Sequence, residues 1–243
     1  MFTIDQIASP LFRGERPSIW GLNLNAFPQG HDDLKEAYET WLKVASPILE
    51  GTGAYLYPFE HTHVTASSPA PFTNPSLTSF TIAEREEYAN AWLIALKATC
   101  CANNSAGVIW PNAPFPLVFE TLELKENCAI FIFRDETGGV AKIRKAVAAA
   151  SCHPIFTTGR PADLLARSGF KTPNIVHSSI MRFAAPRGEG ITDQDISERW
   201  GKAAALWPGP VTVMAEKMTF IIEAVAYQHI SKGDGLIGEF LYE

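Results

Sequence analysis

Two short segments of the sequence carry the same order of residue types, His63-Val64-Thr65 and His177-Ser178-Ser179. Side chains alternate in direction along a β-strand, so a strand would place His63 beside Thr65 and His177 beside Ser179. An imidazole, with an unperturbed pKa of about 6.5, accepts or donates a proton near neutral pH. If both pairs lined one cleft, they would suit an in-line displacement at phosphorus. One histidine would act as base and the other as acid, while the hydroxyls would bind the non-bridging oxygens. The sequence leaves open which histidine is the base.

The first half of the chain contains the elements expected to position the first motif. Alternating residues predict a strand over Ile19–Ala26, and helical spacing from Asp32 predicts a helix that Pro47 ends. An extended run over Ala54–Thr65 carries His63. The remaining elements are a loop over Ser67–Ser79, a helix capped by Thr81 and Glu84, and a hairpin of strands Leu117–Leu124 and Ala129–Phe133.

The second half repeats this order around the second motif. A helix is expected over Val140–Ala150, a long loop over Ser151–Pro173, and a strand over Asn174–Phe183 that carries His177. Thr192 and Asp195 cap a further helix that Pro208 ends. The last elements are strands over Val211–Met214, Met218–Tyr227 and Leu236–Tyr242, with a turn over Lys232–Gly235.

In both halves a histidine-bearing strand is followed by a capped helix and then by strands that would pair as a hairpin. We therefore expect a two-lobed α+β fold in which two antiparallel sheets face a central cleft, helices lie outside, and a pseudo-two-fold axis relates the halves. We interpret residues 1–243 as a single bilobal domain. Its lobes would span roughly 18–135 and 136–243, and elements can be exchanged between them.

With these motifs and this order of elements, the sequence resembles the two-histidine phosphoesterase superfamily, which includes the RNA 2′,3′-cyclic phosphodiesterases. The signature of that family is two His-x-Thr/Ser motifs on strands of a two-lobed α+β fold. The resemblance implies a metal-independent phosphodiesterase without a cofactor, in which His63, Thr65, His177 and Ser179 are catalytic. The implied substrate is a 2′,3′-cyclic phosphate on a small nucleotide or an RNA end.

The sequence departs from the family pattern at one residue and two loops. His61 lies on the same predicted face as His63, where it is a candidate substrate-binding residue. The segments 67–79 and 151–173 are long and could reshape the substrate pocket. The specificity of relatives therefore cannot be transferred.

Two other functions remain open at this point. One is a non-catalytic protein that binds a nucleotide or RNA on the same scaffold. The other is a metal-dependent hydrolase in which His61 and His63 bind zinc together with His153 or Glu60, although their spacing fits no standard ligand set.

Several other polar and aromatic residues have a structural interpretation that we favour over a functional one. Strand alternation puts Arg182 on the opposite face from His177, which suggests a surface charge. Arg160 fits a solvated loop arginine better than a phosphate clamp. The aromatic residues Trp110, Phe115 and Tyr57 could stack on a base but are expected in the core.

Composition limits the partners. The chain has 20 Lys and Arg against 26 Asp and Glu, for a net charge of −6, which argues against binding to extended double-stranded nucleic acid. A small anionic ligand is compatible with this charge because it needs only a few local donors. No uninterrupted apolar run suggests a signal peptide or a membrane span. We expect a soluble, monomeric, cytoplasmic protein, with a nuclear location also open.

Overall fold

The structure is a computed structural model that describes residues 1–15, 18–26, 32–100, 110–111, 113–228 and 235–241. The strands are β1 (Ser18–Ala26), β2 (Ala54–Leu56), β3 (Val64–Ala70), β4 (Phe115–Leu124), β5 (Cys128–Arg134), β6 (His177–Phe183), β7 (Thr212–Ala215), β8 (Lys217–Val225) and β9 (Leu236–Leu241). The α-helices are α1 (Ser9–Phe12), α2 (Asp32–Leu49), α3 (Ile82–Cys100), α4 (Gly139–Ala150), α5 (Gly159–Ser168) and α6 (Asp193–Ala205). The 3₁₀ turns are η1 (Phe59–His61), η2 (Pro75–Ser79), η3 (Pro154–Phe156) and η4 (Ala226–Gln228). The predicted turn at 232–234 lies outside the described residues.

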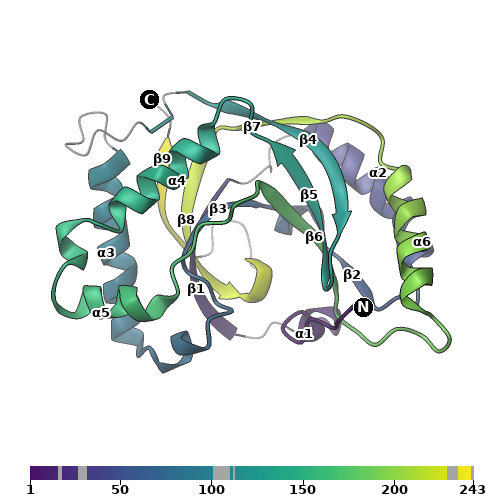
Figure 1. The fold of residues 1–243 in the computed structure, drawn as a ribbon, viewed down its shortest axis with the longest axis horizontal. Coiled ribbons are helices and arrows are strands. Elements are labelled where there is room, and N and C mark those ends of the chain that lie inside the picture. The colour runs from purple at the N-terminus through teal and green to yellow at the C-terminus, as the bar shows by residue number, and fades with distance from the viewer. Residues whose placement is uncertain (16–17, 27–31, 101–109, 112, 229–234, 242–243) are drawn as a thin grey trace.

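The strands form two antiparallel sheets. Sheet A has the order β3-β1-β8-β9, and sheet B has the order β2-β6-β5-β4-β7. Figure 1 shows the two curved sheets facing each other, with α3, α4 and α5 outside sheet A and α2 and α6 outside sheet B. This arrangement confirms the expected α+β fold with two sheets and outer helices.

The two sheets repeat one strand pattern. Apart from β2, the order β6-β5-β4-β7 in sheet B corresponds strand for strand to β3-β1-β8-β9 in sheet A, and both begin with a histidine-motif strand. Each sheet takes strands from both halves of the sequence, since β4 and β5 pair beside β6 while β8 and β9 pair beside β1. The β4–β5 hairpin of the first half therefore lies in the sheet of the second motif, and the β8–β9 hairpin of the second half lies in the sheet of the first motif.

The main core fills the space between each sheet and its helices. On β1, Leu22 and Leu24 are fully buried in it, whereas Asn23 and Asn25 project to the other side of the sheet. On the side of sheet B, Trp41 of α2 packs edge-on against Trp200 and donates from Nε1 to the carbonyl of Ala203 in α6 at 2.8 Å. Because the apolar side chains of β1 pack against the helices, its polar side chains point toward the space between the two sheets.

A second, smaller core joins the ends of both sheets to the N-terminal segment. Its buried members are Ala8, Leu11, Tyr57, Ala184, Ala226 and Tyr227. Tyr57 and Ala184 follow the β2 and β6 strands of sheet B, whereas Ala226 and Tyr227 follow β8 of sheet A. Figure 1 shows α1 between the two sheets at this end. The N-terminal segment therefore closes one end of the space between the sheets.

The chain around the first motif differs from the extended run predicted from sequence. Only Ala54–Leu56 pair as a strand there, because Pro58 is followed by the 3₁₀ turn η1, and His63 lies just before β3 rather than within a strand. β3 then continues to Ala70 through residues expected to belong to a loop. Its backbone pairs with β1, which outweighs the turn preference of Ser67 and Ser68.

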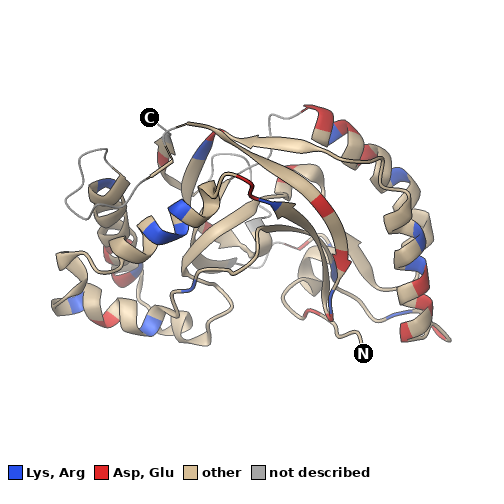
Figure 2. Ribbon diagram, turned by 45° about the horizontal axis from the view of Figure 1, so that its top comes forward, with Lys and Arg blue, Asp and Glu red and all other residues tan. Residues whose placement is uncertain are grey.

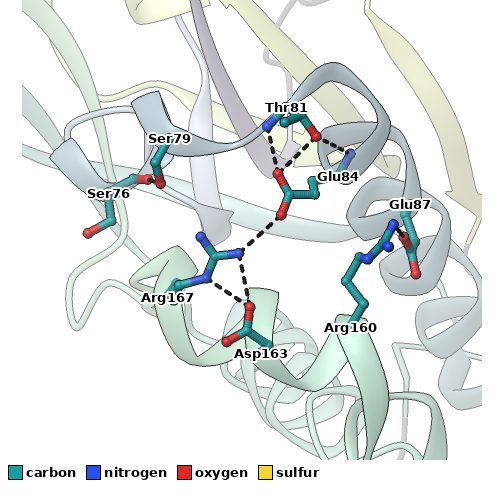
Figure 3. A network of polar contacts seen from close by, with 8 residues as sticks. All are labelled: Ser76, Ser79, Thr81, Glu84, Glu87, Arg160, Asp163 and Arg167. Atoms are coloured by element: carbon teal, nitrogen blue, oxygen red, sulfur yellow. Dashed lines mark hydrogen bonds and ion pairs between the residues drawn. The ribbon is translucent and has the colours of Figure 1, made fainter.

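The segment 151–173, predicted as a loop, contains η3 and the helix α5. Gly159 and Pro161 suggest a loop, yet proline is well tolerated in the first turn of a helix, where its missing N–H is not needed. Arg167 of α5 pairs with Glu84 and Asp163, and Arg160 pairs with Glu87 (Figure 3). Arg160 is thus an exposed helical residue in an ion pair, not a loop residue.

The predicted helix boundaries hold apart from one end. Thr81 with Glu84, and Thr192 with Asp195, form the expected reciprocal caps. α2, however, continues past Pro47 to Leu49, so the hydrogen bond that proline cannot donate is lost only in the last turn. In Figure 2 the charged segments lie mostly on the helices, and the strands are mainly uncharged. Among the helices of the described ranges, none has the length and apolar character to cross a membrane.

Candidate active site

The two histidine motifs come from different sheets and lie side by side. His63 immediately precedes β3, and His177 is the first residue of β6. The backbone N–H of His63 donates to Oγ of Ser178, the middle residue of the second motif, at 3.1 Å across 115 positions of sequence. A positive charge on His177 lowers the pKa of His63, so each imidazole lies within electrostatic reach of the other. The fold thus brings the two motifs to one place.

Exposure alternates along both motifs as the strand pattern predicts. His63 and Thr65 are partly exposed while Val64 between them is buried, and His177 and Ser179 are partly exposed while Ser178 is buried. In each motif the imidazole and the hydroxyl therefore share one face.

The ring of His63 is held in one tautomer. Its Nδ1 lies 3.0 Å from the backbone carbonyl oxygen of His61, and a carbonyl only accepts hydrogen bonds, so Nδ1 must carry the proton. The Nε2 atom of the neutral ring then keeps its lone pair. Burial lowers the pKa of His63 to about 4, and the charges of His177, His61 and Arg182 act in the same direction. His63 is therefore neutral near pH 7 in the ligand-free protein.

The ring of His177 has a corresponding but looser environment. Burial lowers its pKa as well, the backbone of Ile175 acts in the opposite direction, and the charges of Arg144 and Arg182 lower it. Its Nδ1 atom is buried and has no hydrogen-bond partner of good geometry in the described part of the chain. The carbonyl of Ile175, two residues before His177, accepts from Nη2 of Arg144 at 2.7 Å.

Arg144 of α4 connects the backbones of both motifs. Besides the bond to Ile175, two residues before His177, its Nε donates at 3.2 Å to the carbonyl of Ala66, the residue after Thr65. Burial lowers the pKa of Arg144. One planar guanidinium therefore ties the start of β6 to the start of β3.

Both motif strands contain a β-bulge at the same position. On β3, Thr65 pairs with Asn25 and Ser67 with Leu24, so Ala66 is an extra residue. On β6, Ser179 pairs with Ile130 and Met181 with Ala129, so Ile180 is an extra residue. A bulge reverses the alternation of the residues that follow it.

This reversal corrects the prediction for Arg182. Because Ile180 is bulged, Arg182 faces the same side of sheet B as His177 and not the opposite side. Its side chain is 16% exposed and pairs through Nη1 with Oδ2 of Asp5 at 2.8 Å. Its Nε donates to the hydroxyl of Tyr57 at 3.3 Å, and its guanidinium lies 4.1 Å from the ring centre of Tyr227. Arg182 is a largely buried cation near both histidines.

Asp5 and Tyr227 were not found from the sequence. Asp5 accepts hydrogen bonds from the N–H groups of Ile7 and Ala8 and from the hydroxyl of Tyr227. Tyr227 has a positive φ of 56°, which is uncommon for a residue other than glycine and places its ring over Arg182. The signal that could have revealed Arg182 is the apolar pair Ile180-Met181, since two consecutive buried residues interrupt strand alternation.

The other sequence candidates are one histidine beside the site and three aromatic residues. His61 ends η1, is partly exposed, and contacts His63 through its backbone carbonyl. Trp110 packs against Phe240 in the main core, and Phe115 is buried there too. Tyr57 is buried in the second core. As expected, the three aromatic residues named from the sequence are core residues.

The described ranges contain no group of three or more His, Cys, Asp or Glu side chains placed to hold a metal ion. The zinc set of His61, His63 and either His153 or Glu60 is therefore not assembled. The Nδ1 atom of His153 instead accepts from the N–H of Ile155 at the start of η3.

Two solved structures share this architecture over nearly their whole length. TT0787 of Thermus thermophilus matches with a TM-score of 0.52 and 11% identity, over 91% of this chain and 97% of that chain. Escherichia coli LigT complexed with NADP+ matches with a TM-score of 0.50 and 12% identity, over 92% and 98%. The fold is that of the two-histidine phosphoesterases. No model of a known protein family matches the chain, and no curated protein matches its sequence. Identity of 11–12% relates folds only, so the roles of residues rest on the geometry above.

Proposed function

We propose that this chain is a metal-independent phosphodiesterase that opens a 2′,3′-cyclic phosphate on a small nucleotide or an RNA end. The observation that carries the proposal is the hydrogen bond from the His63 backbone to Ser178, which brings two imidazole and hydroxyl pairs together. In each motif the imidazole and the hydroxyl are the partly exposed side chains, and the two motifs are in contact, as acid and base catalysis by two histidines requires.

His63 acts as the general base. Its Nδ1 proton is held by the carbonyl of His61, so the basic lone pair of the neutral ring is on Nε2. The low pKa of His63 keeps this nitrogen unprotonated at neutral pH. Water attacks phosphorus, and Nε2 of His63 takes the proton that the water loses.

His177 acts as the general acid. In the ligand-free site its pKa is lowered, mainly by burial, but a bound phosphate brings a negative charge that favours the imidazolium form. As the bond between phosphorus and the 2′ or 3′ oxygen breaks, His177 donates a proton to that oxygen. The product is a nucleoside monophosphate with one free hydroxyl.

Thr65, Ser179 and Arg182 stabilise the phosphoryl oxygens. The two hydroxyls lie on the histidine faces of β3 and β6, where they would donate to the non-bridging oxygens as charge develops. Arg182 supplies a fixed positive charge on the same face of β6. His61 flanks the site and is the remaining candidate for substrate binding.

A small nucleotide suits the site better than long nucleic acid. The net charge is −6, and the N-terminal segment closes one end of the space between the sheets. The similar E. coli LigT structure contains NADP+, a dinucleotide and not a polynucleotide.

The test is hydrolysis of a panel of the four nucleoside 2′,3′-cyclic phosphates by protein treated with EDTA. His63→Ala and His177→Ala should each lower kcat by roughly 10²- to 10⁴-fold. The surface change Arg160→Ala, away from the motifs, should leave kcat unchanged. Loss of activity on chelation would reject the metal-independent mechanism. Nucleotide binding without turnover would instead support the non-catalytic alternative.

A further inference from the structure

Asn25 of β1 is a buried amide that the protein leaves unsatisfied. Its exposure is 0%, and neither Nδ2 nor Oδ1 has a hydrogen-bond partner among the described residues. Buried side-chain amides are nearly always hydrogen-bonded, because an unmade bond costs the full desolvation of the group. Such a residue needs an explanation.

The strand register places this amide beside the first motif. Asn25 pairs with Thr65 of β3 on one side and with Thr219 of β8 on the other. Directly opposed residues of antiparallel strands project to the same face, so the amide lies next to the hydroxyl of Thr65. The hydroxyl of Thr219 donates to the backbone carbonyl of Asn25 at 3.1 Å, and neither atom of the side-chain amide has a hydrogen-bond partner among the described residues.

The neighbouring asparagine on the same face behaves differently. Asn23, two residues earlier on β1, donates from Nδ2 to the carboxylate of Glu223 on β8. Sheet A therefore provides a hydrogen-bond partner for the amide of Asn23 but none for the amide of Asn25 among the described residues. In sheet B the position corresponding to Asn25, opposite Ser179, is the apolar Ile130. The two halves of the site thus differ, with an unused amide only beside Thr65.

We propose that Asn25 is a substrate-binding residue that recognises a ligand group able to donate and accept hydrogen bonds at once. This inference rests on the proposed function, because it concerns the same site. A phosphate oxygen only accepts, and would leave Oδ1 of Asn25 unpaired. A free sugar hydroxyl or the edge of a nucleobase satisfies both amide atoms. The contrast with Ile130 then orients the ligand, with its polar nucleoside part toward β1 and Thr65.

The amide has no exposed surface in the ligand-free state. Binding therefore requires side chains between the sheets to move apart, as rotamers at binding surfaces commonly do. In that bound state Asn25 makes the hydrogen bonds that the free protein lacks.

The test compares Asn25→Val with the matched variant Asn23→Val, and measures thermal unfolding and nucleotide affinity. Removing an unsatisfied amide should leave the unfolding midpoint of Asn25→Val unchanged or raise it by roughly 2–6 °C. The affinity of Asn25→Val for the nucleoside 2′- and 3′-monophosphates, measured by calorimetry, should fall roughly tenfold. Asn23→Val removes the partner of a buried carboxylate and should lower the midpoint. Asn25→Ala provides the same comparison if valine overfills the site.

The choice of nucleotides separates the two sources of the recognised group. A loss of affinity that differs between the 2′- and 3′-monophosphates identifies the sugar hydroxyl. A loss that differs among adenine, guanine, cytosine and uracil nucleotides identifies the base edge. Both results support the inference.

Equal affinity of Asn25→Val and the unchanged protein would overturn the inference while leaving the proposed function intact. Weakened nucleotide binding in a chain that hydrolyses no cyclic phosphate would support the inference and reject the proposed catalysis. A chain that binds none of these nucleotides would reject both.

Discussion

The guanidinium of Arg182 lies 2.8 Å from the carboxylate of Asp5, although 177 positions of sequence separate the two residues. The carboxylate is itself fixed by the N–H groups of Ile7 and Ala8 and by the hydroxyl of Tyr227. The N-terminal segment thus supplies the counter-charge for a cation in the candidate active site. If Arg182 binds the phosphoryl group as proposed, Asp5 is a positioning residue, because it fixes Arg182.

Replacing Asp5 tests this positioning. Asp5→Asn keeps the shape of the side chain but removes its charge, which leaves Arg182 buried without an ionic partner. We expect the free energy of unfolding to fall by about 3 kcal/mol, as is typical when one member of a buried pair is removed. KM for a cyclic nucleotide should rise roughly tenfold, with a smaller change in kcat, because Arg182 loses its fixed orientation.

Asp163→Asn is the control for Asp5→Asn, because the exposed carboxylate of Asp163 pairs with Arg167 within α5 and lies on another part of the fold. It should change neither stability nor KM appreciably. An unchanged KM in Asp5→Asn would show that Arg182 needs no help from the N-terminal segment.

The pH dependence of kcat/KM follows from the two histidines. The base must be neutral, so activity should fall as pH drops toward about 4, the pKa of His63. The acid must be protonated, and burial lowers the pKa of His177 below its ordinary value of 6.5, so activity should also fall as pH rises above that lowered pKa. The maximum of kcat/KM should therefore lie between about pH 4 and 6.5. A maximum above about pH 7 would contradict the assigned environments.

The same burial makes folding stability depend on pH. The unfolded chain binds a proton at His63 below about pH 6.5, whereas the folded chain does so only near pH 4. The free energy of unfolding therefore decreases as the pH is lowered from about 6.5 to about 4. The contribution of His63 should be on the order of 2–3 kcal/mol, present above about pH 6.5 and lost by about pH 4. Urea unfolding of His63→Gln should show a flatter dependence on pH over this range. Parallel curves for the two proteins would mean that the imidazole gains its proton equally in both states.

Arg144 should matter for the alignment of the two motifs and not for substrate affinity. Arg144→Lys keeps the charge, but an ammonium lacks the planar fork that reaches the carbonyls of Ala66 and Ile175 together. We expect kcat to fall roughly tenfold or more with little change in KM, because a small misplacement of one histidine mainly affects the transition state. Arg134→Lys, the same exchange at an exposed ion pair with Glu136, should leave both constants unchanged. If kcat of Arg144→Lys equals that of the unchanged protein, Arg144 is not needed to align the two motifs.

Local patterns were enough to predict much of the fold. The capping pairs at Thr81 and Thr192, the hairpin of β4 and β5, and the alternation within each motif depend on neighbours in sequence, so they were visible in it. α5 was missed because Gly159 and Pro161 suggest a loop when its burial against the rest of the fold is unknown. The exchange of hairpins between sheets is a property of long-range pairing, which composition and periodicity do not encode.

The contacts of the residues around the motifs were harder to predict from the sequence. Arg182 was assigned to the wrong face because a single bulged residue, Ile180, reverses alternation. The contact between Asp5 and Arg182 has no local signature at all. The amide of Asn25 looked like an ordinary polar position on a half-buried strand, and only the structure shows that it has no partner among the described residues.

The small second core has a consequence for how the protein responds to heat. The N-terminal segment is held there by few apolar side chains, among them Ala8 and Leu11, whereas the main core spans both sheets and their helices. Regions with few buried contacts open at lower free energy than the whole molecule. Warming should therefore detach the segment and leave Arg182 without its counter-charge while the sheets remain folded. Turnover at a substrate concentration below KM would then fall at a lower temperature than the far-ultraviolet circular dichroism signal, and would return on cooling.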